Sequence, residues 1–170
     1  MIPVHPNTIP RVRPLLARAG AALALFRFLI SPGPVLGADS MTSPEKEKEA
    51  LLITLGVISG QGLMLTCTSI ATLADAYVED VYTPEQAAEM AAGYLTMTDS
   101  VRQSLTFLRD SGMLEQEDAE MLNQILVAYE FLHKEIEAFS YFVETGDPKW
   151  VEEYEFNRDK AWEAIEDIGQ

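Results

Sequence analysis

The sequence is poor in the residues that build most catalytic and metal centres. Of its 170 residues, one is a cysteine, Cys67, and two are histidines, His5 and His133. A single cysteine excludes a disulfide within the chain, and a cysteine-based zinc cluster needs several. No Ser-His-Asp set, cysteine–histidine pair or phosphate-binding loop can be assembled from the sequence. We therefore predict a non-catalytic protein without a cofactor.

Positive charge is also scarce. Twelve lysines and arginines stand against 27 acidic residues, which gives a net charge of −15 at pH 7. Residues 1–40 carry four arginines and one aspartate, a charge of +3, so residues 41–170 carry −18. Because so acidic a body repels phosphate backbones, nucleic acid is excluded as an expected partner. A solvated acidic surface, a bound cation or a basic partner remains compatible with this charge.

Residues 1–40 differ from the rest in composition. Prolines at positions 3, 6, 10 and 14 oppose a helix at the start, and an apolar segment interrupted by arginines follows over residues 15–30. Small residues then lead to Ala38, so this segment has the parts of a secretory signal and predicts a periplasmic or secreted protein. Two other interpretations stay open. In one, the segment is a disordered extension and the true start is Met41, which predicts a cytoplasmic protein. In the other, the segment has a structured role.

The longest uncharged run extends from Ala50 to Ala74. It is long enough to cross a membrane, but its glycines and polar side chains make insertion marginal. Apolar residues occupy nearly all sides of its first half, which is typical of a helix buried on several sides. We predict that this helix is the centre of the fold, and that Gly56 and Gly60 permit a close helix approach. Membrane association through residues 15–30 or 50–74 is the alternative.

The remaining sequence predicts three more helices. Thr42–Glu45 at the start of the first helix, and Thr83–Gln86 and Asp147–Pro148 at two later starts, place a capping residue one or two positions before a proline. The acids between Glu115 and Asp118 favour the remaining start. Apolar residues recur at steps of three and four after each start, and Gly112 and Gly146 mark helix ends. Because the loops are short, consecutive helices must be antiparallel, so we predict an all-α, up-down-up-down four-helix bundle with a flexible N-terminal extension. The bundle covers residues 41–170, with helices at about 43–82, 84–111, 115–145 and 148–168.

Polar side chains on the uncharged helix, together with tyrosines and one arginine on the others, are the candidate ligand-binding residues. They are Ser59, Gln61, Thr66, Tyr94, Tyr129 and Arg158. Arg158 stands on the last helix at a position that helical periodicity turns toward the core. Its guanidinium either reaches water past its apolar stem or contacts an acid on the first or third helix, and that contact is the testable expectation. Aromatic residues at helical spacing are expected to be plain core.

Two sets of residues could hold a metal ion. An antiparallel bundle brings Asp75, Glu79, Glu144 and Asp147 to one end, where carboxylates suit calcium, but no loop has the spacing of a calcium-binding hand. We favour a solvated acidic end. Glu130-x-x-His133 has the spacing of one half of a ferritin-like di-metal site, which needs two such motifs and two further glutamates. Helical periodicity also points both residues away from the core direction.

These patterns favour a non-catalytic helical-bundle module that serves in interaction or sensing. Its architecture resembles the four-helix ligand-binding domains of bacterial sensory receptors, which implies a location outside the cytoplasm. The expected partner is another protein or a second copy of the chain. The alternatives are a metal-dependent, ferritin-like enzyme and a small membrane protein that spans the bilayer with residues 50–74.

Overall fold

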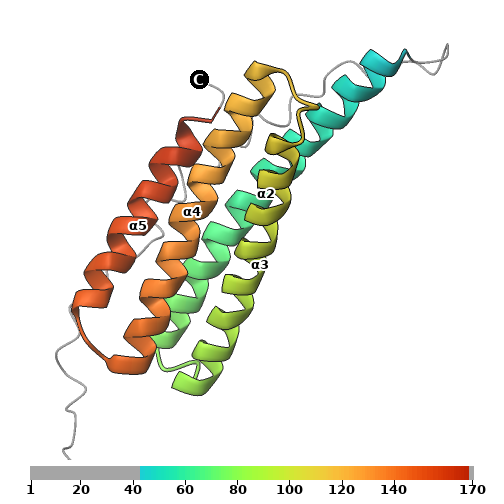
Figure 1. Ribbon diagram of the computed structural model, residues 1–170. Helices are drawn as coiled ribbons and strands as arrows, with labels where there is room; N and C mark the ends of the chain where they lie inside the picture. The colour runs from blue at the N-terminus through green and yellow to red at the C-terminus, as the bar shows by residue number, and fades with distance from the viewer. Residues whose placement is uncertain (1–42, 169–170) are drawn as a thin grey trace, which may run out of the picture. The chain divides into compact units, whose positions relative to one another are not determined.

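The computed structural model describes residues 43–168, and within this range the chain forms four helices and no strand. They are α2 (Pro44–Val78), α3 (Pro84–Asp110), α4 (Gln116–Thr145) and α5 (Lys149–Glu166). Consecutive helices run in opposite directions (Figure 1). The predicted all-α four-helix fold is therefore confirmed. The predictions for residues 1–40 and for a start at Met41 fall outside the described residues.

The first two helix starts use the predicted capping chemistry, with one shift. At the start of α3, the hydroxyl of Thr83 accepts from the backbone N–H of Gln86 at 3.3 Å, and the Gln86 side chain accepts from the backbone N–H of Thr83 at 3.0 Å. At the start of α2, the cap is Ser43 rather than Thr42, because its hydroxyl accepts from the backbone N–H of Lys46 at 3.4 Å. The proline that follows then occupies the first helical position, where it needs no donor.

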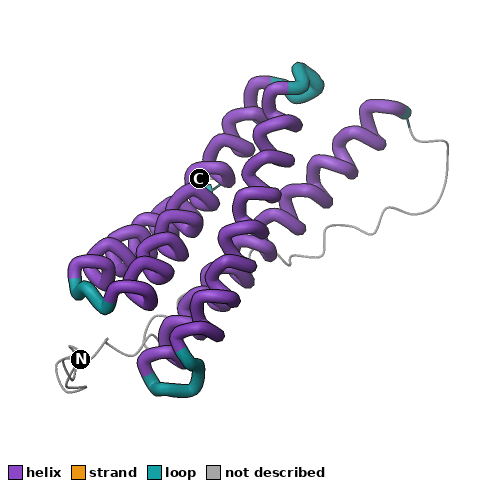
Figure 2. The backbone as a smooth tube through the Cα atoms, turned by 60° about the horizontal axis from the view of Figure 1, so that its bottom comes forward, coloured by secondary structure: helices purple, strands orange, loops and turns teal. Residues whose placement is uncertain are grey.

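Residues with a positive φ lie at the helix ends, and the sequence predicts two of the three. Gly112 and Gly146 take the left-handed conformation, with φ of 72° and 66°, as predicted for glycines that close a helix. The first helix was expected to reach Tyr82, but α2 ends at Val78. Asp80 has a φ of 58°, which an aspartate tolerates better than most residues and which breaks the helix before the next cap. The resulting short loops are teal in Figure 2.

The centre of the bundle is α4, not α2. It packs along its length against both α3 and α5, and it also contacts α2. Six large apolar side chains of α4 are buried, whereas α2 supplies three, Leu63, Ile70 and Leu73. Because each fully buried large apolar side chain contributes about 1.5–3 kcal/mol, the core draws more of its stability from α4. The prediction that α2 is the buried centre is wrong.

The first half of α2 is exposed along its outward side. None of residues 43–58 is buried, and the first turns extend beyond the loop between α3 and α4 (Figure 1). The predicted inward face, which includes Leu63 and Ile70, does lie in the core. The opposite side, which includes Val57, faces outward because the partner helices all pack on one side of α2.

Of the two glycines predicted to permit a close approach, Gly56 has no neighbour near enough, and the prediction for Gly60 is not tested. A Cβ atom added at Gly56 would meet nothing within 4 Å. A Cβ atom added at Gly62 would lie 2.9 Å from the hydroxyl oxygen of Tyr129 on α4. Real Cβ atoms essentially never approach so closely, so the absence of a side chain at Gly62 leaves room for the Tyr129 hydroxyl between α2 and α4.

Candidate functional site

A polar cluster lies inside the bundle between α4 and α5. It consists of Glu135 on α4 and of Tyr154 and Arg158 on α5. Glu135 has no exposed surface, Tyr154 is buried, and the Arg158 side chain is 15% exposed. Helical periodicity explains the burial, since Glu135 lies three residues after Leu132 and four before Phe139, both of which face the core.

Most polar atoms of this cluster make no hydrogen bond of normal geometry. Within residues 43–168, both carboxyl oxygens of Glu135, the hydroxyl of Tyr154 and Nη1 of Arg158 are buried without one, although the Tyr154 hydroxyl lies close enough to the Glu135 carboxyl group to affect its pKa. The guanidinium of Arg158 lies 5.6 Å from the Tyr154 ring, and its Nε lies 4.0 Å from Asp159. The expected contact of Arg158 with an acid is met only in part. Its charge acts on Glu135 and on Asp75 of α2, but no ion pair of 4.0 Å or less joins it to either within the described residues.

Burial controls the protonation of the cluster. It raises the pKa of Glu135 to about 8, although the positive charge of Arg158 and the hydroxyl of Tyr154 act in the opposite direction. Glu135 therefore holds its proton at pH 7. Burial, reinforced by the carboxyl group of Glu135, also raises the pKa of the Cys67 thiol on α2. A thiol kept neutral in this way is a poor nucleophile.

The arrangement can bind a proton, but it is closed to a substrate. General acid–base catalysis needs the acid within hydrogen-bond reach of the reacting group, and Glu135 has no surface that a solute could touch. Buried polar groups without partners cost free energy rather than contribute it. We therefore infer that the cluster affects the stability of the fold.

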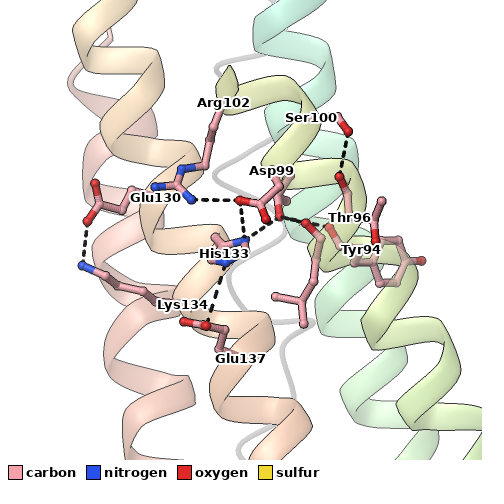
Figure 3. Close-up of polar contacts among 11 residues, drawn as sticks. Tyr94, Thr96, Asp99, Ser100, Arg102, Glu130, His133, Lys134 and Glu137 are labelled. Carbon is pink, nitrogen blue, oxygen red and sulfur yellow. Dashed lines mark hydrogen bonds and ion pairs between the residues drawn. The ribbon is translucent and has the colours of Figure 1, made fainter. Parts of the chain in front are cut away.

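A second polar network joins α3 and α4 near the surface (Figure 3). Oγ1 of the buried Thr98 lies 2.9 Å from Nδ1 of His133. The same ring lies 3.8 Å from a carboxylate oxygen of Asp99 and 3.9 Å from one of Glu137. Glu130, the other half of the Glu-x-x-His spacing, instead accepts from Lys134 on its own helix at 2.8 Å. Glu130 and His133 therefore have separate partners.

The acidic residues predicted to meet at one end do not form a metal site. Asp75, Glu79 and Glu144 are exposed. Asp147 accepts from the backbone N–H of Lys149 at 3.0 Å and lies 3.5 Å from its ammonium group, so its carboxylate already has partners at the start of α5. Across residues 43–168, no group of three or more His, Cys, Asp or Glu side chains could hold a metal ion.

The structure brings together only two of the remaining predicted ligand residues. Thr66 and Tyr129 are both buried, and their side chains interact where α2 meets α4. Ser59 is buried, Tyr94 packs against the core from α3, and Gln61 faces outward. None of these residues lines the groove between α3 and α4. Tyr129 belongs to the core and Tyr94 packs against it, as expected for aromatics at helical spacing.

An open groove lies between α3 and α4, beside the network of Figure 3. Its volume is about 730 Å³, and its lining includes Arg102, Phe107, Val127 and Glu130. Sequence patterns did not signal it, because its lining comes from the outward sides of two helices. Phe107 is 76% exposed, so the groove holds its largest apolar side chain in solvent rather than sheltering it.

The outward side of α2 carries a continuous stripe, which we call the α2 seam. Its members are spaced three and four residues apart: Leu51, Thr54, Ile58, Gln61, Leu65 and Thr68. The three aliphatic members are 71%, 61% and 68% exposed in chain order. The hydroxyls of Thr54 and Thr68 each donate to the backbone carbonyl four residues earlier, at 2.8 Å. Because these hydroxyls are already bonded, the seam behaves as a mostly apolar surface.

Within residues 43–168, α2 is also the one helix long and apolar enough to cross a membrane. Its best window has a mean hydropathy of 1.8, and 22% of that window is buried. The core helix of a soluble protein can meet the same criteria. No family model matches the chain, and comparisons with curated proteins and with solved structures yield no match.

Proposed function

We propose that the chain is a non-catalytic helical-bundle interaction module, and that the α2 seam is the surface through which it binds. The carrying observation is the exposure of Leu51, Ile58 and Leu65 along one side of a helix. In soluble proteins, contiguous apolar surface of this kind marks an interaction site. The seam contrasts with the acidic surface of the rest of the chain, whose net charge is −15.

The bundle itself does not require the seam to be apolar. The inward side of α2 already supplies Leu63, Ile70 and Leu73 to the core. Polar side chains on the outward side would leave that packing unchanged, as they do on most surface helices. A partner explains the apolar side chains, and the bonded threonine hydroxyls lower the cost of covering them.

Lipid is the second candidate for covering the seam, because α2 has the length and hydropathy of a membrane span. Two features favour protein instead. Crossing a bilayer would remove Leu63 and Ile70 from the core, where neither has any exposed surface. It would also place the amide of Gln61 in hydrocarbon, where an unpaired polar group costs several kcal/mol.

The proposal predicts that the seam is covered in the cells that express the protein. An Ile58→Cys variant of the full chain places a thiol on the seam, and a Ser100→Cys variant places one on the exposed side of α3. The thiol at position 58 is expected to react with a permeant maleimide at least about tenfold more slowly, because a docked partner must open first. Cys67 is buried in both variants and serves as an internal reference. Peptide mass spectrometry gives the rates, and equal rates at both positions contradict the proposal.

The composition of residues 1–40 supports a site of action outside the cytoplasm. Intact mass of the natively expressed protein is expected to match a chain cleaved near Ala38. A mass that includes the whole segment, or one that begins at Met41, contradicts this location. The measurement is independent of the seam, because it reports processing and not binding.

A further inference from the structure

We infer that the α2 seam receives an amphipathic helix of another protein, whose docking face is apolar and whose cationic residues lie where α2 ends. The inference rests on the proposed function and names the chemistry of its partner. Three features carry it: the acids at the ends of the seam, the direction of the helix dipole of α2, and the net charge of the chain.

Acids stand at both ends of the seam, on the same side of α2. Glu47 lies one turn before its first member, and Asp75 and Glu79 lie two and three turns after its last. All three are exposed. The two ends differ in their cations, because Lys46 and Lys48 neighbour Glu47, whereas the last turn of α2 has no basic residue. A docked helix therefore meets the strongest negative charge at the C-terminal end.

Negative charge accumulates where α2 ends. Asp75, Glu79 and Asp80 are exposed there, and the helix dipole adds its own partial negative charge. Across the described residues, no ion pair of 4.0 Å or less reaches any of the three. Burial and the charge of Glu79 raise the pKa of Asp75, although Arg158 acts in the opposite direction. Cationic groups of a partner would relieve this repulsion and gain affinity from it.

The seam also defines the apolar face and the length of its partner. Thr54, Gln61 and Thr68 alternate with the larger aliphatic members, so they leave room for large apolar side chains from a docked helix. From the first member of the seam to Glu79, α2 advances by about 42 Å, which a partner helix of about 28 residues covers. Such a helix places its apolar stripe on the seam and its lysines or arginines beside the acids.

A second copy of the chain fits the seam poorly. In a parallel pair, Asp75 and Glu79 would face their own copies. In an antiparallel pair that matches large to small side chains, Asp75 would lie beside Glu47 of the other copy. Both orientations bring carboxylates together, and like charges repel at such distances. Each copy also carries a net charge of −15, which opposes self-association at long range.

A lipid surface fits the seam no better. Helices that lie on membranes carry lysines and arginines beside their apolar face, and these attract anionic headgroups. The seam instead ends in Glu47, Asp75 and Glu79, which an anionic surface repels. A protein helix with cationic residues at one end matches both the apolar side chains and the acids.

Fluorescence anisotropy of a synthetic peptide with the purified full chain tests the inference. The probe is a labelled peptide of about 28 residues, with lysines in its first two turns and leucines at steps of three and four among neutral residues thereafter. It is kept at nanomolar concentration so that it does not pair with itself. We expect micromolar binding to the wild type, and binding at least about thirtyfold weaker when glutamates replace the lysines. Equal binding of the two peptides overturns the inference.

A neutral double substitution on the seam tests where the lysine peptide docks. An Ile58→Ser, Leu65→Ser variant keeps the charge of the chain and is expected to weaken binding at least about a hundredfold, because it removes two large apolar contacts. Phe107→Ser is the matched control, since Phe107 is an exposed apolar residue of α3, and its affinity is expected to stay within about twofold. Circular dichroism confirms that both variants are helical. Equal losses in the two variants overturn docking on the seam.

Neutral substitutions of the acids test the charge at the end of α2. An Asp75→Asn, Glu79→Gln variant is expected to bind the lysine peptide at least about tenfold more weakly than the wild type. Glu117→Gln, Glu120→Gln is the matched control, because it removes two exposed acids from the first turns of α4. Its affinity is expected to stay within about twofold. Equal losses would show that only the net charge of the chain matters, which overturns the placement of the cationic end.

Disulfide formation tests that placement directly. A cysteine is added to the peptide beside its lysines, and the full chain carries either Thr72→Cys or Leu51→Cys. Both positions are exposed on the outward side of α2, at opposite ends of the seam, whereas Cys67 is buried. We expect the peptide to join position 72 and not position 51, since the two lie about 32 Å apart along one helix. The reverse preference overturns the inference.

The remaining outcomes separate this inference from the proposed function. Sedimentation velocity is expected to show a monomer, and a dimer that the two serines dissociate would make a second copy the occupant and overturn the inference. Flotation of the wild type, but not of the serine variant, with phosphatidylcholine vesicles would make lipid the occupant and overturn both proposals. If the lysine peptide fails to bind while position 58 is protected in cells, the interaction module stands with a partner of other chemistry. Equal rates at positions 58 and 100 in cells remove the proposed function and the inference together.

Discussion

Replacement of Glu135 by glutamine is expected to remove most of the pH dependence of stability between pH 5 and 8. Burial raises the pKa of this carboxyl group from 4.5 to about 8 on folding. Between these values the folded chain holds a proton that the unfolded chain has released. The stability contributed by this site is therefore fully present below pH 4.5 and is lost as the pH rises toward 8, at about 1.4 kcal/mol per pH unit. Glutamine does not titrate, so its slope is expected to be close to zero.

The substitution is also expected to stabilise the protein at neutral pH. At pH 7 the wild type has lost on the order of 3 kcal/mol relative to low pH, whereas glutamine leaves a neutral group of the same size in the same place. Three of the groups near Glu135 do not produce this slope, and a fourth, Asp159, raises the pKa of Glu135 through its charge. Burial raises the pKa of Cys67 and of Tyr154, so both titrate above the window, and the charge of Arg158 is constant.

Urea unfolding monitored by circular dichroism at half-unit pH steps gives the free energy of unfolding in each case. Glu144→Gln is the matched control, because Glu144 is an exposed acid on the same helix, and the wild-type slope is expected to remain. A Glu135→Gln chain that keeps the wild-type slope would show that the buried carboxyl group is not its source. The conclusion that the cluster belongs to the energetics of the fold would then need revision.

The four helices could be predicted from the sequence because their signals are local. Capping residues, prolines and closing glycines mark the boundaries, as Thr83 and Gly146 do. Helical periodicity also predicts the inward face of α2, where Leu63 and Ile70 are fully buried. Periodicity cannot tell whether the outward side is covered by another helix of the same chain, by a second chain or by solvent. The first half of α2 was therefore predicted to be buried on several sides, although an apolar residue such as Val57 faces outward.

The buried cluster was only half visible in the sequence. Arg158 was noticed because an arginine at a core-phase position is conspicuous. Glu135 stands at an equivalent position of α4, but it is one of 27 acids and was not separated from the exposed ones. A search for acids in the core phase opposite Arg158 would have found it. Whether the two groups form a hydrogen bond depends on side-chain geometry that periodicity does not specify.

The second large expected effect is on the free energy of unfolding, and it tests which helix is central to the bundle. Leu132→Ala in α4 is expected to destabilise the protein by about 2–5 kcal/mol, because the removed atoms lie in a site with no exposed surface and leave a cavity. Ile53→Ala in α2 removes a comparable amount of apolar side chain and is expected to change the free energy of unfolding by no more than about 0.5 kcal/mol, because Ile53 is exposed. Urea unfolding of the two variants beside the wild type gives both values.

The comparison is informative because the two arrangements predict opposite orders. If α2 were buried on all sides, Ile53 would lie among neighbouring helices, and its truncation would cost as much as that of a core leucine. Ile53 also lies outside the α2 seam, so its truncation leaves the proposed interface intact. A loss above about 2 kcal/mol at Ile53, with a smaller loss at Leu132, would place α2 at the centre. The expected order instead means that α3, α4 and α5 hold the inward side of α2, while its outward side contributes little to the stability of the fold.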